Sequence, residues 1–304
     1  MRRLFFLVLT VLAVVYCSGC AGTVDKQNDA AKKQSYVVQD VRGKKLSFES
    51  KPQKIISLYV YGDEVLLGLV DHKRIAGLSK WVHDEDLAMG AKEAKDVPQI
   101  AESNPEAILA LKPDLVLLPD SSKPEQISSL EDVGIKVFVY PAASRLSNIP
   151  KTIKAIGGAV GEPEQAEKLI AEMQKKISAV EAKVKKMQPE DRKKGLLFLR
   201  FGAIGGKGII FNDIMTAAGV EDCYEAARHT IADKPGMSRI LSKEEVVQAN
   251  PDYIIIGTWS QGGAYKSGNA QLEELYSDPA LATVTAVKKK QAIVIPQGYV
   301  NCLS

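Results

Sequence analysis

The chain has 304 residues, of which 40 are basic and 37 acidic, and its net charge is +3 at pH 7. Arg2 and Arg3 belong to a leader segment, and removing them takes the 40 basic residues to 38 against the 37 acidic ones. No basic block remains in the rest of the chain. The charge pattern therefore excludes nucleic acid as an expected partner.

An apolar run from Leu4 to Tyr16 follows the two arginines. It is shorter than the roughly 20 residues that a membrane-spanning helix needs. Small residues then precede Cys20, which resembles the signal peptide of a bacterial lipoprotein. We therefore predict a signal peptide over residues 1–19, with cleavage before Cys20 and a lipid on its sulfur. A plain secretory signal is the alternative, and Cys17 is a poorer lipidation site because bulky Tyr16 would precede the cut.

Residues 20–35 are polar and lack an apolar period, which predicts a flexible tether. Strand and helix patterns alternate in the segment that follows, and this alternation indicates an N-terminal α/β lobe over residues 36–160. The expected strands are residues 36–40, 44–48, 55–58, 74–78 and 136–140, and the expected helices are residues 63–69 and 124–133.

Residues 104–118 and 242–256 share one pattern, with Glu, Pro and Asp at matching positions. Each copy begins with a residue that caps helices well, and a proline then ends the helix. The apolar run that follows is continuous, which is typical of a strand buried on both faces of a parallel sheet. The repeat predicts the same helix–strand unit in two similar lobes, and it places Glu106 and Glu244 in equivalent first helical turns.

Residues 163–187 form the longest predicted helix, and their apolar positions step by four and three alternately along one face. At 1.5 Å per residue such a helix spans roughly 37 Å, which is more than one small lobe needs. We therefore predict that residues 161–189 connect the first lobe to a second α/β lobe over residues 190–304. In the second lobe the expected strands are residues 196–201 and 291–295, and a helix is expected at residues 211–218.

The sequence contains, in this order, Lys54-Ile55-Ile56-Ser57-Leu58, Asn104-Pro105-Glu106, Leu111-Lys112-Pro113-Asp114-Leu115-Val116, the helix 163–187 and Ala286-Val287-Lys288. With the lipoprotein start, these segments resemble the binding proteins of iron-siderophore, haem and cobalamin importers over residues 36–304. The resemblance implies an α/β fold of two Rossmann-like lobes joined by a single long backbone helix, the class III periplasmic-binding fold. The family usually has a further C-terminal helix, which this sequence lacks after its last strand, so we expect a short or truncated second lobe.

The resemblance implies a carrier whose ligand lies in a cleft between the lobes. The carrier would deliver its ligand to a membrane permease dimer driven by a cytoplasmic ATPase. By motif position, Glu106 and Glu244 would dock on arginines of the permease. A first-turn glutamate also complements the helix macrodipole, typically by ~0.3–1 kcal/mol, so each glutamate alone has a structural explanation. Glu245, the next residue, is a weaker rival to Glu244.

Ligands of open α/β sheets bind beyond the carboxyl ends of the strands. The segments that follow the predicted strands combine aromatic and cationic residues. Aromatic faces suit flat or conjugated ligands, and Arg and Lys suit anionic ones. The predicted ligand-binding residues are Tyr59, Tyr61, Trp81, Ser121, Ser122, Lys123, Arg200, Met237, Arg239, Trp259 and Tyr299.

Neither a metal site nor catalysis is predicted. The three histidines are widely separated, whereas a zinc site needs several convergent ligands, and the sequence has no serine-hydrolase elbow or metalloprotease helix motif. Gly205-Gly206-Lys207-Gly208 lacks the P-loop spacing and is predicted to be a flexible turn. Cys223 and Cys302 can form a disulfide in an exported protein or remain as buried thiols.

We therefore expect an exported monomer without enzymatic activity or a resident cofactor. It is expected to be lipid-anchored on the outer face of the cell membrane, in the periplasm where an outer membrane exists. Its expected ligand is a ferric siderophore, because cationic cleft candidates outnumber axial ligands for a haem iron. Haem or cobalamin is the alternative within the family, and a ligand-sensing or surface lipoprotein that is not coupled to transport is the alternative outside it.

Overall fold

The first described elements pair as the predicted hairpin, in which β1 (Tyr36–Gln39) runs antiparallel to β2 (Lys45–Phe48). The structure is a computed structural model, and it describes residues 35–100, 103–206, 209–224, 238–259 and 267–301. The predicted signal peptide and Cys20 lie outside these residues. In the hairpin, the rings of Tyr36 and Phe48 stack with their centroids 5.1 Å apart.

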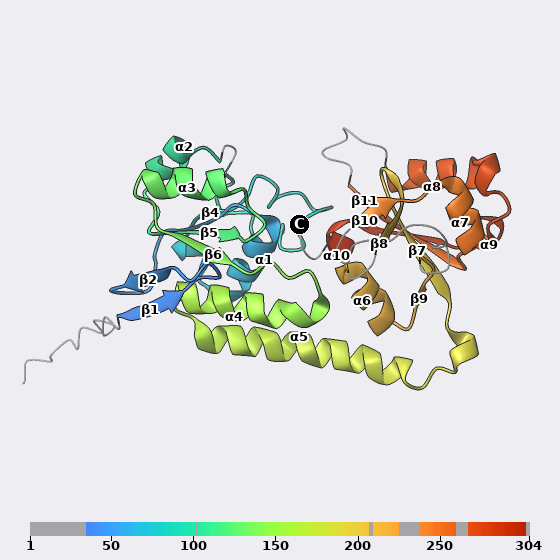
Figure 1. Cartoon of the computed structure of the whole chain (residues 1–304), viewed down its shortest axis with the longest axis horizontal. Helices are drawn as coiled ribbons and strands as arrows, with labels where there is room; N and C mark the ends of the chain where they lie inside the picture. The colour runs from blue at the N-terminus through green and yellow to red at the C-terminus, as the bar shows by residue number, and fades with distance from the viewer. Residues whose placement is uncertain (1–34, 101–102, 207–208, 225–237, 260–266, 302–304) are drawn as a thin grey trace, which may run out of the picture. The chain divides into compact units, whose positions relative to one another are not determined.

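A four-stranded parallel sheet forms the centre of the N-terminal lobe, in the order β4-β3-β5-β6 (Figure 1). All residues of β5 are buried, as its continuous apolar run predicts. Leu115 and Leu117 pack on one face, and Val116 and Leu118 pack on the other. The strands are β3 (Ile55–Ser57), β4 (Ile75–Gly77), β5 (Leu115–Pro119) and β6 (Val137–Tyr140), and the helices are α1 (Val60–Leu69), η1 (His72–Arg74), α2 (Pro105–Ala110), α3 (Pro124–Asp132), η2 (Leu146–Asn148) and α4 (Ile149–Val160).

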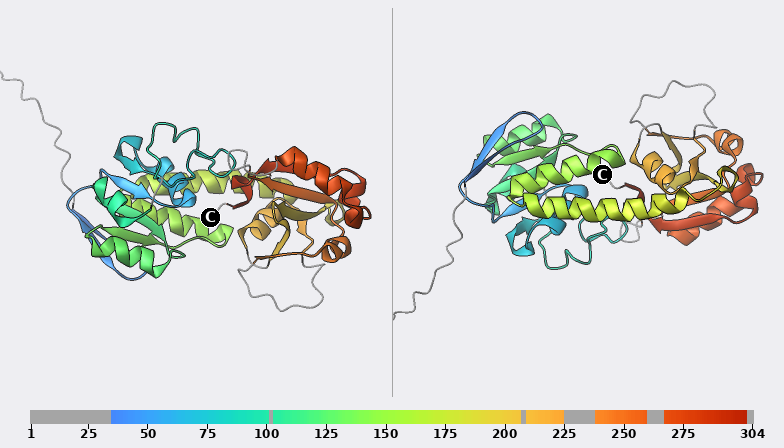
Figure 2. Two further views of the ribbon diagram at one scale, coloured as in Figure 1. Left: turned by 90° about the horizontal axis from the view of Figure 1, so that it is seen from above. Right: turned by 90° about the horizontal axis from the view of Figure 1, so that it is seen from below.

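The longest helix in the described part of the chain is α5 (Pro163–Val184). Figure 2 shows it beside α4, where Gly157 leaves room for the side chain of Ala166. At its far end, Val184 and Met187 lie against Gly219, and α5 also contacts α6 (Ile210–Ala217). The helix therefore contacts elements of both lobes. Neither α5 nor any other described helix is long and apolar enough to cross a membrane.

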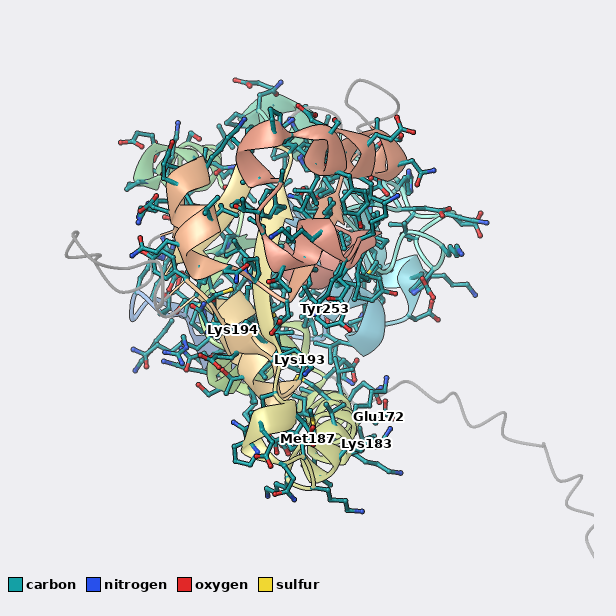
Figure 3. The ribbon with its side chains drawn as sticks, turned by 90° about the vertical axis from the view of Figure 1, so that its right-hand side faces the viewer. Glu172, Lys183, Met187, Lys193, Lys194 and Tyr253 are labelled. Atoms are coloured by element: carbon teal, nitrogen blue, oxygen red, sulfur yellow. The ribbon has the colours of Figure 1, made fainter. Side chains whose placement is uncertain are left out.

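The described part of the C-terminal lobe contains a six-stranded sheet in the order β10-β8-β7-β11-β12, with β9 paired to β7. Strands β7, β11 and β12 are parallel, whereas β8 runs antiparallel to β7 and to β10. Lys194 and Tyr253, labelled in Figure 3, begin the neighbouring strands β7 and β11. The elements are η3 (Pro189–Asp191), β7 (Lys194–Leu199), β8 (Gly202–Gly206), β9 (Glu221–Asp222), β10 (Ser238–Ile240), α7 (Lys243–Ala249), β11 (Tyr253–Thr258), α8 (Gly268–Ser277), η4 (Pro279–Leu281), α9 (Thr285–Lys288), β12 (Ala292–Pro296) and α10 (Gly298–Asn301).

The sequence repeat is also a repeat in structure. It forms α2 followed by β5 in one lobe and α7 followed by β11 in the other. Each strand lies in the middle of a parallel trio, with β5 between β3 and β6 and β11 between β7 and β12. Asn104 Oδ1 accepts from Ala107 N at 2.7 Å, and Ser242 Oγ accepts from Glu245 N at 3.2 Å. Both helices are therefore capped as the sequence predicts.

Strands β9 and β10 and helix α8 are absent from the sequence prediction, and three other segments also differ from that prediction. Helix α4 has no counterpart in it, because Gly157 and Gly158 weaken the helical pattern while packing on α5 stabilises the helix. The prediction of a flexible turn is wrong for Gly205 and Gly206, which lie in β8, while the rest of that run lies outside the described residues. A short helix, α10, follows β12 where no closing helix was expected.

An ion pair joins the two lobes in addition to α5. Arg145, which follows β6, donates from Nε and Nη2 to the two carboxylate oxygens of Asp213 in α6, at 2.8 and 2.5 Å. Leu146 N donates to the same carboxylate at 2.9 Å. The hydrogen bonds from Arg145 lower the pKa of Asp213. Such a paired, planar contact fixes the direction of approach as well as the distance.

Cys223 is a buried free thiol at the edge of the C-terminal sheet. Its Sγ donates to the carbonyl oxygen of Gly195 at 3.1 Å, and burial raises its pKa to about 12. Such a thiol is poorly reactive at neutral pH, because the thiolate is the nucleophile. Of the two alternatives for the cysteines, the buried thiol describes Cys223, while Cys302 lies outside the described residues.

Candidate functional site

Residues that follow strands of both lobes border one hollow of about 580 Å³. Tyr59 follows β3 and Trp81 follows β4, while Trp259 follows β11 and Gln297 follows β12. This is the edge at which parallel α/β sheets bind ligands. The other described residues that line the hollow are Leu58, Val60, Lys80, Leu87, Ser103 and Gln126.

Trp81 and Trp259, the only tryptophans in the sequence, contact each other at this hollow. Their ring centroids are 5.3 Å apart and their planes meet at 87°, an edge-to-face arrangement that aromatic pairs favour. The indole Nε1–H of Trp259 donates to Asp84 Oδ2 at 2.8 Å. The loop after β4 is therefore tied to the residue that follows β11.

Cationic groups lie over both indole rings. Lys80 Nζ is 4.6 Å from the centroid of the Trp81 ring, and the guanidinium carbon of Arg200 is 4.9 Å from that of Trp259. Arg200 also lies 4.3 Å from the ring of Phe201. These distances are within the range of cation–π attraction. The site therefore combines flat apolar faces with positive charge, as the sequence predicts for an anionic or conjugated ligand.

A buried carboxyl group supports the loop that carries Lys80 and Trp81. Asp63, in the first turn of α1, is fully buried. Its Oδ2 accepts from Ser79 N at 3.1 Å, and Ser79 Oγ accepts from Trp81 N at 3.4 Å. Burial raises the pKa of Asp63 to about 7, and hydrogen bonds from Ser79 and Ser57 offset only part of this effect.

The start of α10 contacts the same loop through the backbone. Gly298 N donates to the carbonyl oxygen of Asp86 at 2.7 Å. A Cβ atom at position 298 would lie 2.5 Å from the carbonyl oxygen of Leu87, so only glycine allows this approach. The end of β12 is thereby held close to the hollow, and Gln297, which precedes Gly298, lines it.

The structure brings three of the predicted ligand-binding residues to the hollow, namely Tyr59, Trp81 and Trp259. Tyr59 also donates from its hydroxyl group to Gln126 Oε1 at 3.4 Å. Arg200 does not line this hollow but contacts Trp259, and it lines a second hollow of about 320 Å³ beside α7 and α8.

The remaining predicted residues lie elsewhere. Tyr61 is buried in the core of the N-terminal lobe, because α1 begins at Val60 and turns the side chain inward. Ser122 is buried, Ser121 and Lys123 are exposed at the start of α3, and Tyr299 is exposed on α10. Arg239 is paired with Glu245, and Met237 lies outside the described residues. The described geometry does not place these side chains at the hollow.

Several residues of the site were missed in the sequence. Gln126 lies in the first turn of α3, and Gln297 follows the last strand, so neither belongs to an aromatic or cationic cluster. Asp84 follows Trp81 by three residues and could have been found as a partner for an indole N–H. No sequence pattern marked Asp63, because its support of the loop after β4 depends on its burial.

The two predicted docking glutamates are both exposed and both lie in first helical turns. Glu245 differs, because Arg239 donates to its two carboxylate oxygens at 2.9 and 2.6 Å. That pairing, with the backbone N–H of Ser242, lowers the pKa of Glu245 to about 2. Glu245 is therefore occupied within its own lobe, and the geometry favours Glu244 over its rival as a residue available to a partner.

The sequence from residue 55 to residue 299 matches the periplasmic binding protein family. An ABC transporter substrate-binding lipoprotein of Bacillus subtilis, YvrC, is 26% identical over 81% of this chain and 77% of its own length. A vitamin B12-binding protein of Pectobacterium atrosepticum is 27% identical over 72% of this chain and 75% of its own. An iron(3+)-hydroxamate-binding protein of Bacillus subtilis, YxeB, is 23% identical over 96% of this chain and 89% of its own length.

Solved structures resemble the fold. The periplasmic heme-binding protein RhuT from Roseiflexus sp. RS-1 has a TM-score of 0.65 and 21% sequence identity, covering 82% of this chain and 90% of its own. The α/β architecture, the parallel sheets and the family match over residues 55–299 agree with the fold that the sequence predicts. On these grounds, the chain belongs to the periplasmic binding protein family.

Proposed function

We propose that this protein is the extracytoplasmic, lipid-anchored substrate-binding component of an ABC importer, and that it captures a ferric siderophore. The observation that carries the proposal is the hollow that Trp81 and Trp259 share, with Lys80 and Arg200 over the indole rings. Flat faces with nearby cations suit a conjugated, anionic metal chelate. The similarity to a hydroxamate-binding protein supports the ligand class, and the similarity to a transporter lipoprotein supports the role and the anchor.

Cobalamin is the second candidate ligand. The observation in its favour is the similarity to a vitamin B12-binding protein that covers about three quarters of that protein. A corrin ring is large and conjugated, so indole faces also suit it. The cations over the indoles favour the siderophore, because a neutral corrin does not require them.

Ligand binding should quench the fluorescence of both tryptophans. We expect saturable quenching of the purified protein by ferric enterobactin, an anionic tris-catecholate chelate, and weaker binding of this chelate by the variants Trp81→Phe and Trp259→Phe. Tyr253→Phe is the control, since Tyr253 begins β11 at the opposite end from the hollow. If the quenching saturates with cyanocobalamin alone or with haemin alone, that compound and not a siderophore is the ligand of this protein. If none of the three ligands quenches the fluorescence, the hollow is not the binding site.

The importer role requires a permease contact, and Glu106 and Glu244 are proposed to make it. The pKa of Glu244 is lowered by its own backbone N–H and by the hydroxyl group of Ser242, so its carboxylate stays charged at neutral pH. The repeat places both glutamates in the same way on the two lobes. A partner that presents the same cationic surface twice, as a symmetric dimer does, fits this arrangement.

The double variant Glu106→Ala/Glu244→Ala should lower ligand uptake by intact cells by about tenfold or more, because each loss removes one partner of a charge pair at an interface. Ligand quenching of the purified variant should be unchanged. The matched control is Glu125→Ala/Glu164→Ala, which removes two exposed first-turn glutamates that follow prolines, as Glu106 does. Uptake that persists in the first variant with ligand binding intact would refute the importer-docking role and favour a sensor or surface lipoprotein.

A further inference from the structure

The repeated unit conserves more than a helix and a strand. Ile108 and Val246 occupy matching positions, and both are buried. Lys112 and Asn250 also match, and both adopt a left-handed backbone conformation, with φ of 51° and 42°. The fold of the unit explains each of these shared features, because they form the core contact and the turn between helix and strand.

The aspartates at the end of the unit match in the same way. Asp114 accepts hydrogen bonds from Gln53 N and Lys54 N, which precede β3. Asp252 accepts one from Lys194 N at the start of β7. Since β3 and β7 are the strands beside β5 and β11, the two aspartates fix equivalent neighbours. This shared feature also belongs to the internal structure of each lobe.

Two further pairs of matching positions point to solvent instead. Glu106 and Glu244 are exposed, and so are the aliphatic residues three positions later, Leu109 and Val247, with 44% and 36% of their surface accessible. Residues three apart lie on the same face of a helix. One exposed leucine needs no explanation. An exposed aliphatic beside an exposed glutamate, at the same place in both lobes, is a repeated surface rather than an internal contact.

We propose that each lobe docks on the permease through two adjacent groups, a carboxylate and an aliphatic side chain, as Glu106 with Leu109 and as Glu244 with Val247. The inference rests on the proposed importer function and adds to it the chemistry of the partner. The surface that receives each lobe carries a cation next to an apolar recess, and the transporter presents this pair twice. The charge of the glutamates and their duplication fit a partner that presents a cationic surface twice, which under the proposed function is the permease dimer.

The aliphatic residue gives the contact the stability that a charge pair lacks. A solvent-exposed ion pair contributes little to stability. Covering the exposed part of Leu109 and Val247 adds a favourable contribution in proportion to the apolar area removed from water. An apolar neighbour also excludes water from the charge pair, as the rims of strong contacts do at other protein interfaces. Leu109 and Val247 therefore set the strength of docking, while the glutamates set its position.

Photocrosslinking in the cells that make this protein tests the contact directly. The full-length protein would carry benzoylphenylalanine at position 109 or position 247, and the adducts would be identified by mass spectrometry. We expect adducts with the same permease polypeptide from both positions. Val133, which is 38% exposed beyond the end of α3, is the control position and should give no such adduct. Adducts at neither position, or no more than at the control, would overturn the inference.

A second variant tests the energetic role. Leu109→Gln/Val247→Thr keeps side-chain size and helix propensity while making both positions polar. Uptake of the ligand that quenches the tryptophans should fall by about tenfold, with quenching unchanged. The control is Val37→Thr/Val133→Thr, two exposed valines outside the repeated units.

The two hypotheses fail in different ways. If the glutamate variant loses uptake while Leu109→Gln/Val247→Thr transports normally and positions 109 and 247 crosslink to the permease no more than position 133 does, the importer function stands and this inference is wrong. If the glutamate variant transports normally and adducts form with proteins other than a permease, the proposed function itself is wrong.

Discussion

Asp63 should lower the free energy of unfolding by about 4 kcal/mol as the pH rises from about 4 to about 8, and the variant Asp63→Asn should lack this contribution. The carboxyl group is fully buried, and its pKa in the folded protein is raised from 3.8 to about 7. Burial is the main cause, because the charged form loses its hydration.

The direction in which stability changes with pH follows from the pKa values of Asp63 in the unfolded and the folded chain. Below about pH 4 the carboxyl group is protonated in both the folded and the unfolded chain, so its contribution to stability is fully present. Between about pH 4 and pH 7 the unfolded chain releases the proton while the folded chain retains it, and stability falls with rising pH. Above pH 7 both states are ionised, and the loss is complete. The folded protein therefore favours the protonated form of Asp63.

Urea unfolding of the wild type and of Asp63→Asn at several pH values measures this contribution, as the difference between the two curves. Asparagine keeps the size of the side chain and an oxygen that can accept from Ser79 N. The control is Asp71→Asn, which changes an exposed N-cap aspartate for another good capping residue. Parallel curves for the wild type and Asp63→Asn would show that the carboxyl group titrates normally.

Gly205→Ala should destabilise the C-terminal lobe by about 3 kcal/mol or more. A Cβ atom on Gly205 would overlap the ring of Tyr224, which is almost fully buried and cannot swing away. Arg239 lies opposite Gly205 in the β8–β10 pair, and its guanidinium carbon is 5.6 Å from the Tyr224 ring. Since Arg239 also pairs with Glu245 in α7, the substitution should shift the helix that carries Glu244.

The loss is measured by urea unfolding of the variant, followed by the fluorescence of its tryptophans. Gly158→Ala is the matched control, because its new Cβ atom would meet only Val38, at the ordinary contact distance of 3.9 Å. That change lies within a helix, where alanine is favoured over glycine by up to about 1 kcal/mol. Equal stability of the two variants would show that the Tyr224 ring adapts without cost.

Local sequence signals predicted the parts of the fold that local chemistry determines. The repeat identified both helix–strand units, since capping residues, a helix-ending proline and a continuous apolar run act over a few residues. The long helix also followed from its periodicity, although α5 ends at Val184, three residues before the predicted end. Elements with weaker local patterns were missed. Helix α4 depends on the fit of Gly157 to Ala166, and β8 depends on the fit of Gly205 to Tyr224.

Among the described residues that line the hollow, only the aromatic ones were predicted from the sequence. Tyr59, Trp81 and Trp259 were found because they follow buried strands, and the ends of parallel strands meet at one edge. Tyr61 was placed incorrectly by the same rule, because α1 starts directly after Tyr59 and carries Tyr61 into the core. The raised pKa of Asp63 depends on how completely the surrounding chain excludes water. No short pattern in the sequence encodes that exclusion.

The ion pair between Arg145 and Asp213 closes a loop of the chain that passes through both lobes. From Arg145 the chain runs through α4, α5 and β7 to α6, and the paired side chains join its two ends. Torsion of one lobe about the axis of α5 must therefore shear a contact whose planar geometry tolerates little twist. Because α5 and this ion pair both oppose such twisting, we expect the spacing between α2 and α7 to change little when a ligand binds.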